Sequence, residues 1–124
     1  MLKFNVNKNN ENQFYSIVEK YLKSKLTFQR RIALIILFKF INDKNIDKVL
    51  QIINSLHDEK EYYVNMANAW LLCECFIKQK EKTYKLLNNH NLNKFTINKA
   101  ISKCRDSFRV HKEDKDNLVK YRIK

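Results

Sequence analysis

The sequence predicts an all-α protein built as a helical-repeat solenoid, an alpha-alpha superhelix of about three antiparallel helix pairs. The first observation is that the 124 residues include no Gly and no Pro, although hairpins and sharp strand turns mostly need Gly at positive φ. The second is that apolar residues recur at helical spacing along most of the chain. The third is that the expected helices form similar pairs at a regular interval.

The expected elements follow a polar start at residues 1–12. A first helix begins near Gln13, because apolar side chains share one face at Phe14, Ile17, Val18, Tyr21 and Leu22. Thr27 is a candidate N-cap for a second helix over Phe28 to Ile41, which is apolar on nearly all sides after its two arginines and is therefore expected to be buried. A third, amphipathic helix carries Ile46, Val49, Leu50, Ile53 and Leu56.

The second half of the chain continues the alternation. A largely apolar helix from Glu61 to Ile77 contains the only Trp, and a shorter helix spans Lys80 to Leu87. Thr96 can cap a helix that runs to about Phe108, and a basic segment from about Asp114 to Lys124 closes the chain. Without Gly, helix ends are expected to close on left-handed Asn residues, at Asn42, Asn54, Asn88 and Asn89.

The more buried helix of each pair begins near Thr27, Glu61 and Thr96, at spacings of 34 and 35 residues. A period in this range, built from helix–turn–helix units, is typical of a helical solenoid. HEAT repeats average a little longer, so the class is clearer than the subtype. A four-helix bundle is the structural alternative, but it calls for helices of more equal length. We therefore treat residues 13–124 as one HEAT-like helical-repeat domain.

The net charge of +12 indicates a polyanionic partner, either nucleic acid or an anionic membrane. The charge is not evenly spread. From Lys94 to Lys124 there are ten Lys or Arg residues against four Asp or Glu residues, so half of the net charge lies in the last quarter of the chain.

Several classes of site are excluded by composition and spacing. Without Gly there is no P-loop or dinucleotide-binding fingerprint. The three cysteines are expected to be buried, reduced thiols, because Cys73 and Cys75 are too close on a helix to bridge each other. His57, His90 and His111 have no ligand spacing, so neither a metal nor a cofactor is expected. No apolar run spans a membrane and no secretory signal is present, which predicts a soluble protein of the cytoplasm, in the bacterial cytosol or at the nucleoid.

Cations on the second helix of each pair are the candidate contacts for a polyanion. One helix of each pair lines the concave face of a helical solenoid, where an elongated ligand such as duplex DNA could lie. Lys99 and Lys103 lie one turn apart, off the apolar stripe of their helix, and would contact phosphates without reading sequence. Arg30 and Arg31 open an otherwise apolar helix, so they need either local carboxylates or an external polyanion. Trp70 lies mid-helix, where a Trp either packs in the core or stacks against a cation or a sugar.

Three segments occur in an order and at separations that are typical of one family. Residues 27–41 read TFQRRIALIILFKFI, residues 61–78 read EYYVNMANAWLLCECFIK, and residues 95–124 read FTINKAISKCRDSFRV followed by HKEDKDNLVKYRIK. They resemble the Arg-bearing helix, the Trp-bearing helix and the C-terminal repeat with its closing helix in the AlkD-like DNA alkylation repair proteins. The resemblance covers roughly Gln13 to the C-terminus, and the chain looks like the C-terminal portion of this family.

The resemblance implies a HEAT-like repeat DNA glycosylase, which holds duplex DNA in a concave basic groove and removes purines alkylated at N3 or N7. Such bases already carry a positive charge, so the family's enzymes mainly stabilise an oxocarbenium-like sugar and position a water, using an Asp on an earlier helix. By residue-wise matching, Arg31 corresponds to the family's DNA-contacting Arg and Trp70 to an active-site aromatic that faces the groove. The candidate DNA-binding residues are therefore Arg30, Arg31, Trp70, Lys99, Lys103 and Arg109.

The chain departs from the family because it starts after the segment that carries the catalytic Asp and its neighbouring Trp. Asp43 and Asp47 lie at a helix–helix connection, and the catalytic role is not transferred to them. We expect a chain that binds duplex DNA without sequence preference and is inactive alone, with a missing N-terminal half or a partner chain supplying the rest. Two alternatives stay open: a complete small enzyme that uses another carboxylate, and a non-catalytic helical-repeat module that binds protein or RNA.

Overall fold

The computed structural model describes residues 6–124, and every regular element in that range is helical. The α-helices are α1 (Glu11–Leu22), α2 (Thr27–Leu37), α3 (Ile46–Ser55), α4 (Tyr62–Lys78), α5 (Lys80–Asn88), α6 (Lys94–Asp106) and α7 (Lys112–Leu118). Two 3-10 helices, η1 (Phe38–Phe40) and η2 (Val119–Tyr121), extend α2 and α7. No strand occurs from residue 6 onward, which confirms the all-α prediction. The first five residues of the expected polar start lie outside the described residues.

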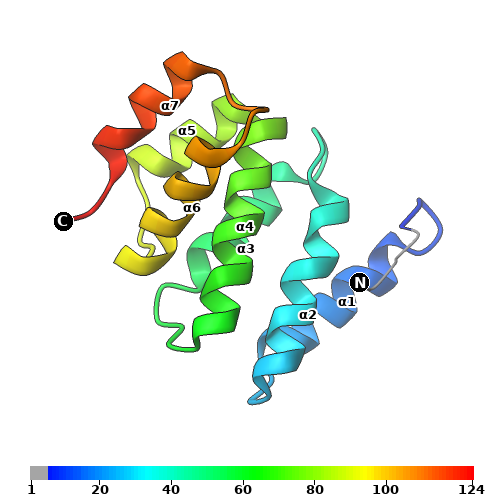
Figure 1. The fold of residues 1–124 in the computed structure, drawn as a ribbon. Coiled ribbons are helices and arrows are strands. Elements are labelled where there is room, and N and C mark those ends of the chain that lie inside the picture. Colours follow the sequence, from blue (N-terminus) through cyan, green and yellow to red (C-terminus); the bar gives the residue numbers. More distant parts are fainter. Residues whose placement is uncertain (1–5) are drawn as a thin grey trace.

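The helices form two layers, with the second helix of each pair in one layer and the first in the other (Figure 1). In the front layer of Figure 1, α4 lies between α2 and α6. Behind them, α1 packs on α2, while α3 and α5 pack on α4 and on each other. The closing helix α7 packs on α6. This arrangement confirms the predicted helical-repeat solenoid.

The central helix, α4, is surrounded by α2, α3, α5 and α6. It therefore buries residues on most of its circumference, including Val64, Ala69, Leu71, Leu72, Cys75 and Phe76. The fully buried amide of Asn68 donates a hydrogen bond to the carbonyl of Ile53 at 3.1 Å, which ties α4 to α3. Within the described part of the chain, no helix, α4 included, has the length and apolarity needed to cross a membrane.

Successive repeats are joined by hydrogen bonds between residues 33 to 37 positions apart. The bonded pairs are Asn88–Tyr121, Lys80–Asp114, Lys82–Asp47, Arg109–Glu74, Gln79–Asp43 and Asn91–Asn54. These separations bracket the interval of 34 to 35 residues inferred from the sequence. Equivalent positions of adjacent repeats are therefore in direct contact, which is how a solenoid propagates its order from one repeat to the next.

The helix ends correct one prediction. No residue between 6 and 124 has a positive φ, so none of these helices closes on a left-handed Asn. The cap of α5, Asn89, has φ −154° and ψ 75° instead. Asn serves through its side chain: Asn42 Oδ1 accepts from the N–H of Asn45 at 2.9 Å, and Asn93 Oδ1 accepts from the N–H of Thr96 at 2.9 Å. The short acceptor side chain closes turns and helix starts, so no strained φ is needed.

The two predicted threonine caps are also wrong. Thr27 is the first residue of α2, and Leu26 precedes it as the cap without a side-chain hydrogen bond. Thr96 is buried inside α6, whose cap is the preceding Asn, a residue that N-cap positions prefer over Thr. The same helix ends at Asp106, so Phe108 lies in the turn that follows it.

Candidate nucleic-acid interface

The two adjacent arginines at the start of α2 have different surroundings. Arg30 Nε donates to Glu59 Oε1 at 2.7 Å, and Arg30 Nη2 donates to Glu59 Oε2 at 3.1 Å. Arg30 Nη1 also donates to the carbonyl of Ser24 at 2.9 Å. Arg31 is exposed and forms no ion pair with any residue in the range 6–124. The local carboxylate that the sequence analysis allowed for is thus present for the first arginine and, among the described residues, absent for the second.

The pair of Arg30 and Glu59 is largely shielded from solvent, with side-chain exposures of 15% and 8%. Burial acts to raise the pKa of the Glu59 carboxyl, but hydrogen bonds from Arg30 and from the backbone N–H groups of Lys60 and Glu61 outweigh burial and lower that pKa overall. The same pair raises the pKa of Arg30. It fixes the turn before α4 to the start of α2, where Arg31 is the next residue.

Trp70 is exposed, with 57% of its surface accessible, while its neighbours Ala69 and Leu71 are fully buried. Of the interpretations left open for it, packing in the core is therefore wrong. The Nζ atom of Lys103 lies 4.7 Å from the centroid of the Trp70 ring, within cation–π distance. Two residues that the sequence predicted separately, one on α4 and one on α6, are thus brought together.

Further aromatic side chains line the same contact between α4 and α6. The ring centroids of Tyr62 and Phe95 are 5.5 Å apart, and Tyr62 also meets Tyr63 at 5.2 Å. Lys99 lies one turn after Phe95, with its Nζ 5.9 Å from the Phe95 centroid. All three aromatic residues are exposed. We call this surface, formed by Tyr62, Tyr63, Trp70, Phe95, Lys99 and Lys103, the α4–α6 strip.

Arg109 lies beyond one end of the strip, in the turn after α6. Its guanidinium pairs with Glu74, which follows Trp70 by one turn on α4, and this hydrogen bond raises the pKa of Arg109. The turn is closed by Ser107, whose Oγ accepts from the N–H of Arg109 at 3.2 Å. Phe108, between them, is 95% exposed. Arg109 is therefore close to the strip, but its charge is matched by a carboxylate.

The thiols of Cys73 on α4 and Cys104 on α6 are in contact between the two helices that carry the strip. Their hydrogen bond lowers the pKa of Cys73 and raises that of Cys104. Burial raises the pKa of the third thiol, Cys75, to about 12. All three cysteines are buried and free, as predicted. The small thiols let α4 and α6 approach closely, which holds the two sides of the strip together.

The opposite layer carries ion pairs, and one of its paired lysines, Lys48, also lies over a ring, with its Nζ 4.0 Å from the Tyr15 centroid. The ion pairs join α1 to α3, α3 to α5, and α5 to α7 in succession. The pairs and their N–O distances are Lys44–Glu11 at 3.4 Å, Lys48–Glu19 at 3.8 Å, Lys82–Asp47 at 3.2 Å and Lys80–Asp114 at 3.2 Å. Four lysines on this side of the molecule thus have an acidic partner on a neighbouring helix.

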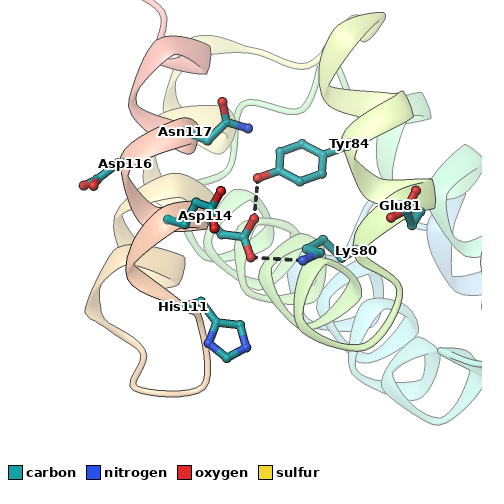
Figure 2. A pocket seen from close by; sticks show the side chains of 8 residues that line it. Lys80, Glu81, Tyr84, His111, Asp114, Asp116 and Asn117 are labelled. Atoms are coloured by element: carbon teal, nitrogen blue, oxygen red, sulfur yellow. Dashed lines mark hydrogen bonds and ion pairs between the residues drawn. The ribbon is translucent and has the colours of Figure 1, made fainter.

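A polar hollow between α5 and α7 is unsuited to a polyanion (Figure 2). Asp114 accepts a hydrogen bond from the Tyr84 hydroxyl at 2.9 Å and pairs with Lys80, as the dashed lines in Figure 2 show. The other lining residues are Glu81, His111, Glu113, Asp116 and Asn117. Carboxylates outnumber cations here, so the hollow repels phosphate.

Other side chains engage Asp43 and Asp47, to which the catalytic role is not transferred, and also Glu74, which lies one turn from Trp70. Asp43 Oδ1 accepts from Gln79 Nε2 at 2.8 Å, Asp47 pairs with Lys82, and Glu74 pairs with Arg109. No group of three or more His, Cys, Asp and Glu residues in the range 6–124 is arranged to hold a metal ion.

Sequence reasoning missed the aromatic residues Tyr62, Tyr63, Phe95 and Phe108 as part of this surface. A signal was present for two of them. Phe95 lies one turn before Lys99, off the apolar stripe of its helix, and Tyr62 lies two turns before Trp70. Helical spacing alone would have grouped these rings with the residues that were singled out.

One protein family matches most of the chain. The family model described as DNA alkylation repair enzyme matches residues 2–104. The matched range includes Arg31 and the whole of the α4–α6 strip, and it ends before Arg109. Comparison with the curated proteins and with the solved structures gives no match.

Proposed function

Since the chain belongs to the DNA alkylation repair enzyme family, we propose that it binds duplex DNA, without reading base sequence, on the exposed side of the layer formed by α2, α4 and α6. The observation that carries this proposal is the state of the cations. Arg31 has no carboxylate partner among residues 6–124, and Lys99 and Lys103 face aromatic rings. The lysines that bridge the helices of the opposite layer are matched by acids. A polyanion is the partner that unmatched cations attract.

Arg31, Lys99 and Lys103 contact backbone phosphates in this proposal, which gives affinity but no sequence preference. Trp70 packs its exposed ring against a sugar of the bound strand, in the manner that the family resemblance implies. The protein would work in the compartment that holds the DNA, the bacterial cytosol.

Arg30 and Arg109 have different roles in the proposal. The guanidinium of Arg30 is held by Glu59, so it supports the start of α2 and adds to DNA binding mainly by presenting the next residue. Arg109 pairs with Glu74 through one nitrogen and is 46% exposed, so its remaining N–H donors are available to a phosphate.

The proposed function stops at binding, because base excision needs an acid or base within reach of the reacting atoms. Glu74, the acid one turn from Trp70, is committed to an ion pair, and its side chain is only 13% exposed. Excision of purines alkylated at N3 or N7 would therefore require a carboxylate from another chain or segment.

Binding is tested by fluorescence anisotropy of a labelled duplex as salt rises from about 50 to about 200 mM. With about three phosphate contacts, counterion release predicts a loss of affinity of about fortyfold across that range. An affinity that stays flat would contradict the DNA proposal and favour the alternative of a helical-repeat module that binds a protein.

Catalysis is tested separately by incubating the chain alone with DNA that contains 7-methylguanine. The expected result is stable binding with no released base. Clear turnover would show that a carboxylate of this chain does the chemistry, with Asp43, Asp47 and Glu74 as the first residues to substitute.

A further inference from the structure

Five of the exposed large apolar side chains gather along the contact between α4 and α6. They are Tyr62, Tyr63, Trp70, Phe95 and Phe108. The ring contact between Tyr62 and Phe95 marks one end of the line, and the ion pair that holds the turn of Phe108 marks the other. Single exposed apolar residues need no explanation, but several exposed rings gathered at one helix contact mark an interaction surface.

Cations alternate with these rings along the α4–α6 strip. Lys99 lies over Phe95, and Lys103 lies over Trp70, at 5.9 and 4.7 Å from the ring centroids. An aromatic face holds a cation in place without cancelling its charge, so both lysines remain able to attract phosphate. Stacking rings interleaved with cations are the two components that bind single-stranded nucleic acid.

The spacing of the rings favours unpaired bases over a base-paired stack. Trp70 lies two helical turns after Tyr62, a rise of about 12 Å, and Lys103 lies two turns after Phe95. Bases within a duplex repeat every ~3.4 Å, and neighbouring bases cover both of their faces. A duplex therefore offers these rings only base edges, sugars and phosphates. A single strand can splay its bases and lay them against separate aromatic platforms.

We propose that the α4–α6 strip binds single-stranded DNA, with unpaired bases stacked on Trp70 and Phe95 and phosphates beside Lys103 and Lys99. The choice of DNA as the nucleic acid rests on the proposed function. The inference adds the substrate class: DNA that contains an unpaired stretch, such as a gap or a frayed end, held by stacking as well as by charge.

The first test uses the emission of Trp70, the only Trp of the chain, as a reporter inside the strip. The wild-type protein is titrated with an oligo-dT strand, with an abasic strand of equal length, and with a duplex of equal length. The abasic strand keeps the phosphates and lacks the bases. The oligo-dT strand is expected to quench the emission and to bind about tenfold more tightly than the abasic strand, because stacking adds to the phosphate contacts. Equal affinity for the two strands would overturn the proposal.

The second test compares Phe95→Ala with a matched control, Phe28→Ala. Phe28 is 68% exposed at the start of α2, outside the strip. Phe95→Ala is expected to weaken oligo-dT binding about tenfold and to leave duplex affinity within about twofold. Phe28→Ala is expected to leave both unchanged. An equal effect of the two substitutions on oligo-dT binding would refute a role for the strip.

The two proposals fail in different ways in these titrations. If the protein binds oligo-dT but not the duplex, the single-strand proposal for the strip stands and the proposed duplex binding is refuted. If the protein binds the duplex but has equal affinity for the oligo-dT and abasic strands, the proposed function stands and the single-strand proposal for the strip is refuted.

Discussion

The layer of α1, α3 and α5 pairs lysines with acids from the next helix, including Lys48, which also lies over a ring. In the layer of α2, α4 and α6, Lys99 and Lys103 lie over aromatic rings and have no ion pair among the described residues. An exposed ion pair contributes little to stability, about 0 to 1 kcal/mol, but it cancels the local field. A ring orders a lysine side chain and leaves its charge in place. The two layers therefore order similar side chains with opposite consequences for a charged ligand.

The two layers thus differ in how many of their cations are matched by a carboxylate. The ion-paired layer works as a scaffold that fixes successive repeats to each other. In the ring-lined layer Arg31 is exposed, whereas Lys99 and Lys103 are half-buried beside their rings, and none of the three has an ion pair among the described residues. A polyanion would then be attracted to one face of the solenoid, as the proposed function requires.

The largest expected effect tests whether the ring-lined face is truly a surface. Phe76, which is buried on α4, should cost about 3–5 kcal/mol of unfolding free energy when replaced by Ala. Trp70→Ala on the same helix should cost much less, under about 1 kcal/mol, because its ring is mostly exposed. Urea unfolding of both variants measures the difference. A loss of more than about 3 kcal/mol for Trp70→Ala would mean that the ring belongs to the core.

The next prediction compares two triple variants, one in each layer, that lower the net charge by the same amount. Replacing Arg31, Lys99 and Lys103 together by Ala should weaken duplex binding on the order of 10²-fold near 0.1 M salt, because three phosphate contacts are lost. The slope of log affinity against log salt should also fall by about 3. Anisotropy titrations over a range of salt concentrations give both quantities.

The matched control removes three lysines from the ion-paired layer, Lys44, Lys48 and Lys82. It lowers the net charge by the same amount, so long-range attraction falls equally in both triple variants. Its affinity is expected to fall less than about fivefold, since no direct phosphate contact is lost. Equal losses in the two triple variants would mean that the whole surface, and not one face, attracts DNA.

The sequence was sufficient to predict the helices, their pairing and the repeat interval, because each of these depends on local periodicity. The buried helices followed from apolar residues on nearly all sides, and α4 is the helix with most neighbours. The interval followed from where such helices begin, and the hydrogen bonds between repeats agree with it. The absence of Gly led to the prediction that helices end on left-handed Asn residues. That prediction was wrong, because Asn side chains close the turns by accepting hydrogen bonds from backbone N–H groups.

The interface was harder to predict, because periodicity tells which face a residue lies on but not what lies opposite. Arg30 and Arg31 look alike in the sequence, and the acid that separates them is 29 residues away in a turn. Trp70 sits between buried residues, so its exposure depends on where α6 packs. Phe95 and Tyr62 are recognised as parts of one surface only when their ring contact across that same pair of helices is known.

The adjacent arginines give a smaller and sharper test of the comparison. Arg30→Ala should lower the unfolding free energy by about 2 kcal/mol, because it leaves the shielded Glu59 carboxylate without its charged donor. Arg31→Ala should change stability by less than about 0.5 kcal/mol, but it should weaken DNA binding and reduce the salt slope by about 1. Chemical unfolding and salt-dependent anisotropy separate the two roles. If Arg31→Ala lowered stability and Arg30→Ala weakened DNA binding, the roles of the two arginines would be the reverse of those proposed.

The smallest effect concerns pH and again separates a matched charge from an unmatched one. The pKa of Glu59 is lowered in the folded protein: burial opposes this, but the hydrogen bonds from Arg30 and the backbone outweigh it. A carboxyl with a lowered folded pKa stabilises the protein above its unfolded pKa of about 4.3, and this stabilisation is lost as pH falls through the folded value. The stability advantage of the wild type over Glu59→Gln should therefore be constant between about pH 6 and 7 and shrink below about pH 4.5.

Asp47→Asn, in the ion-paired layer, is the control, since Asp47 is 76% exposed and its pair with Lys82 contributes little. Unfolding in urea at several pH values measures both differences. Parallel wild-type and Glu59→Gln profiles down to about pH 3 would mean that the hydrogen bonds of Glu59 do not favour its charged form, and that the start of α2 is held by other contacts.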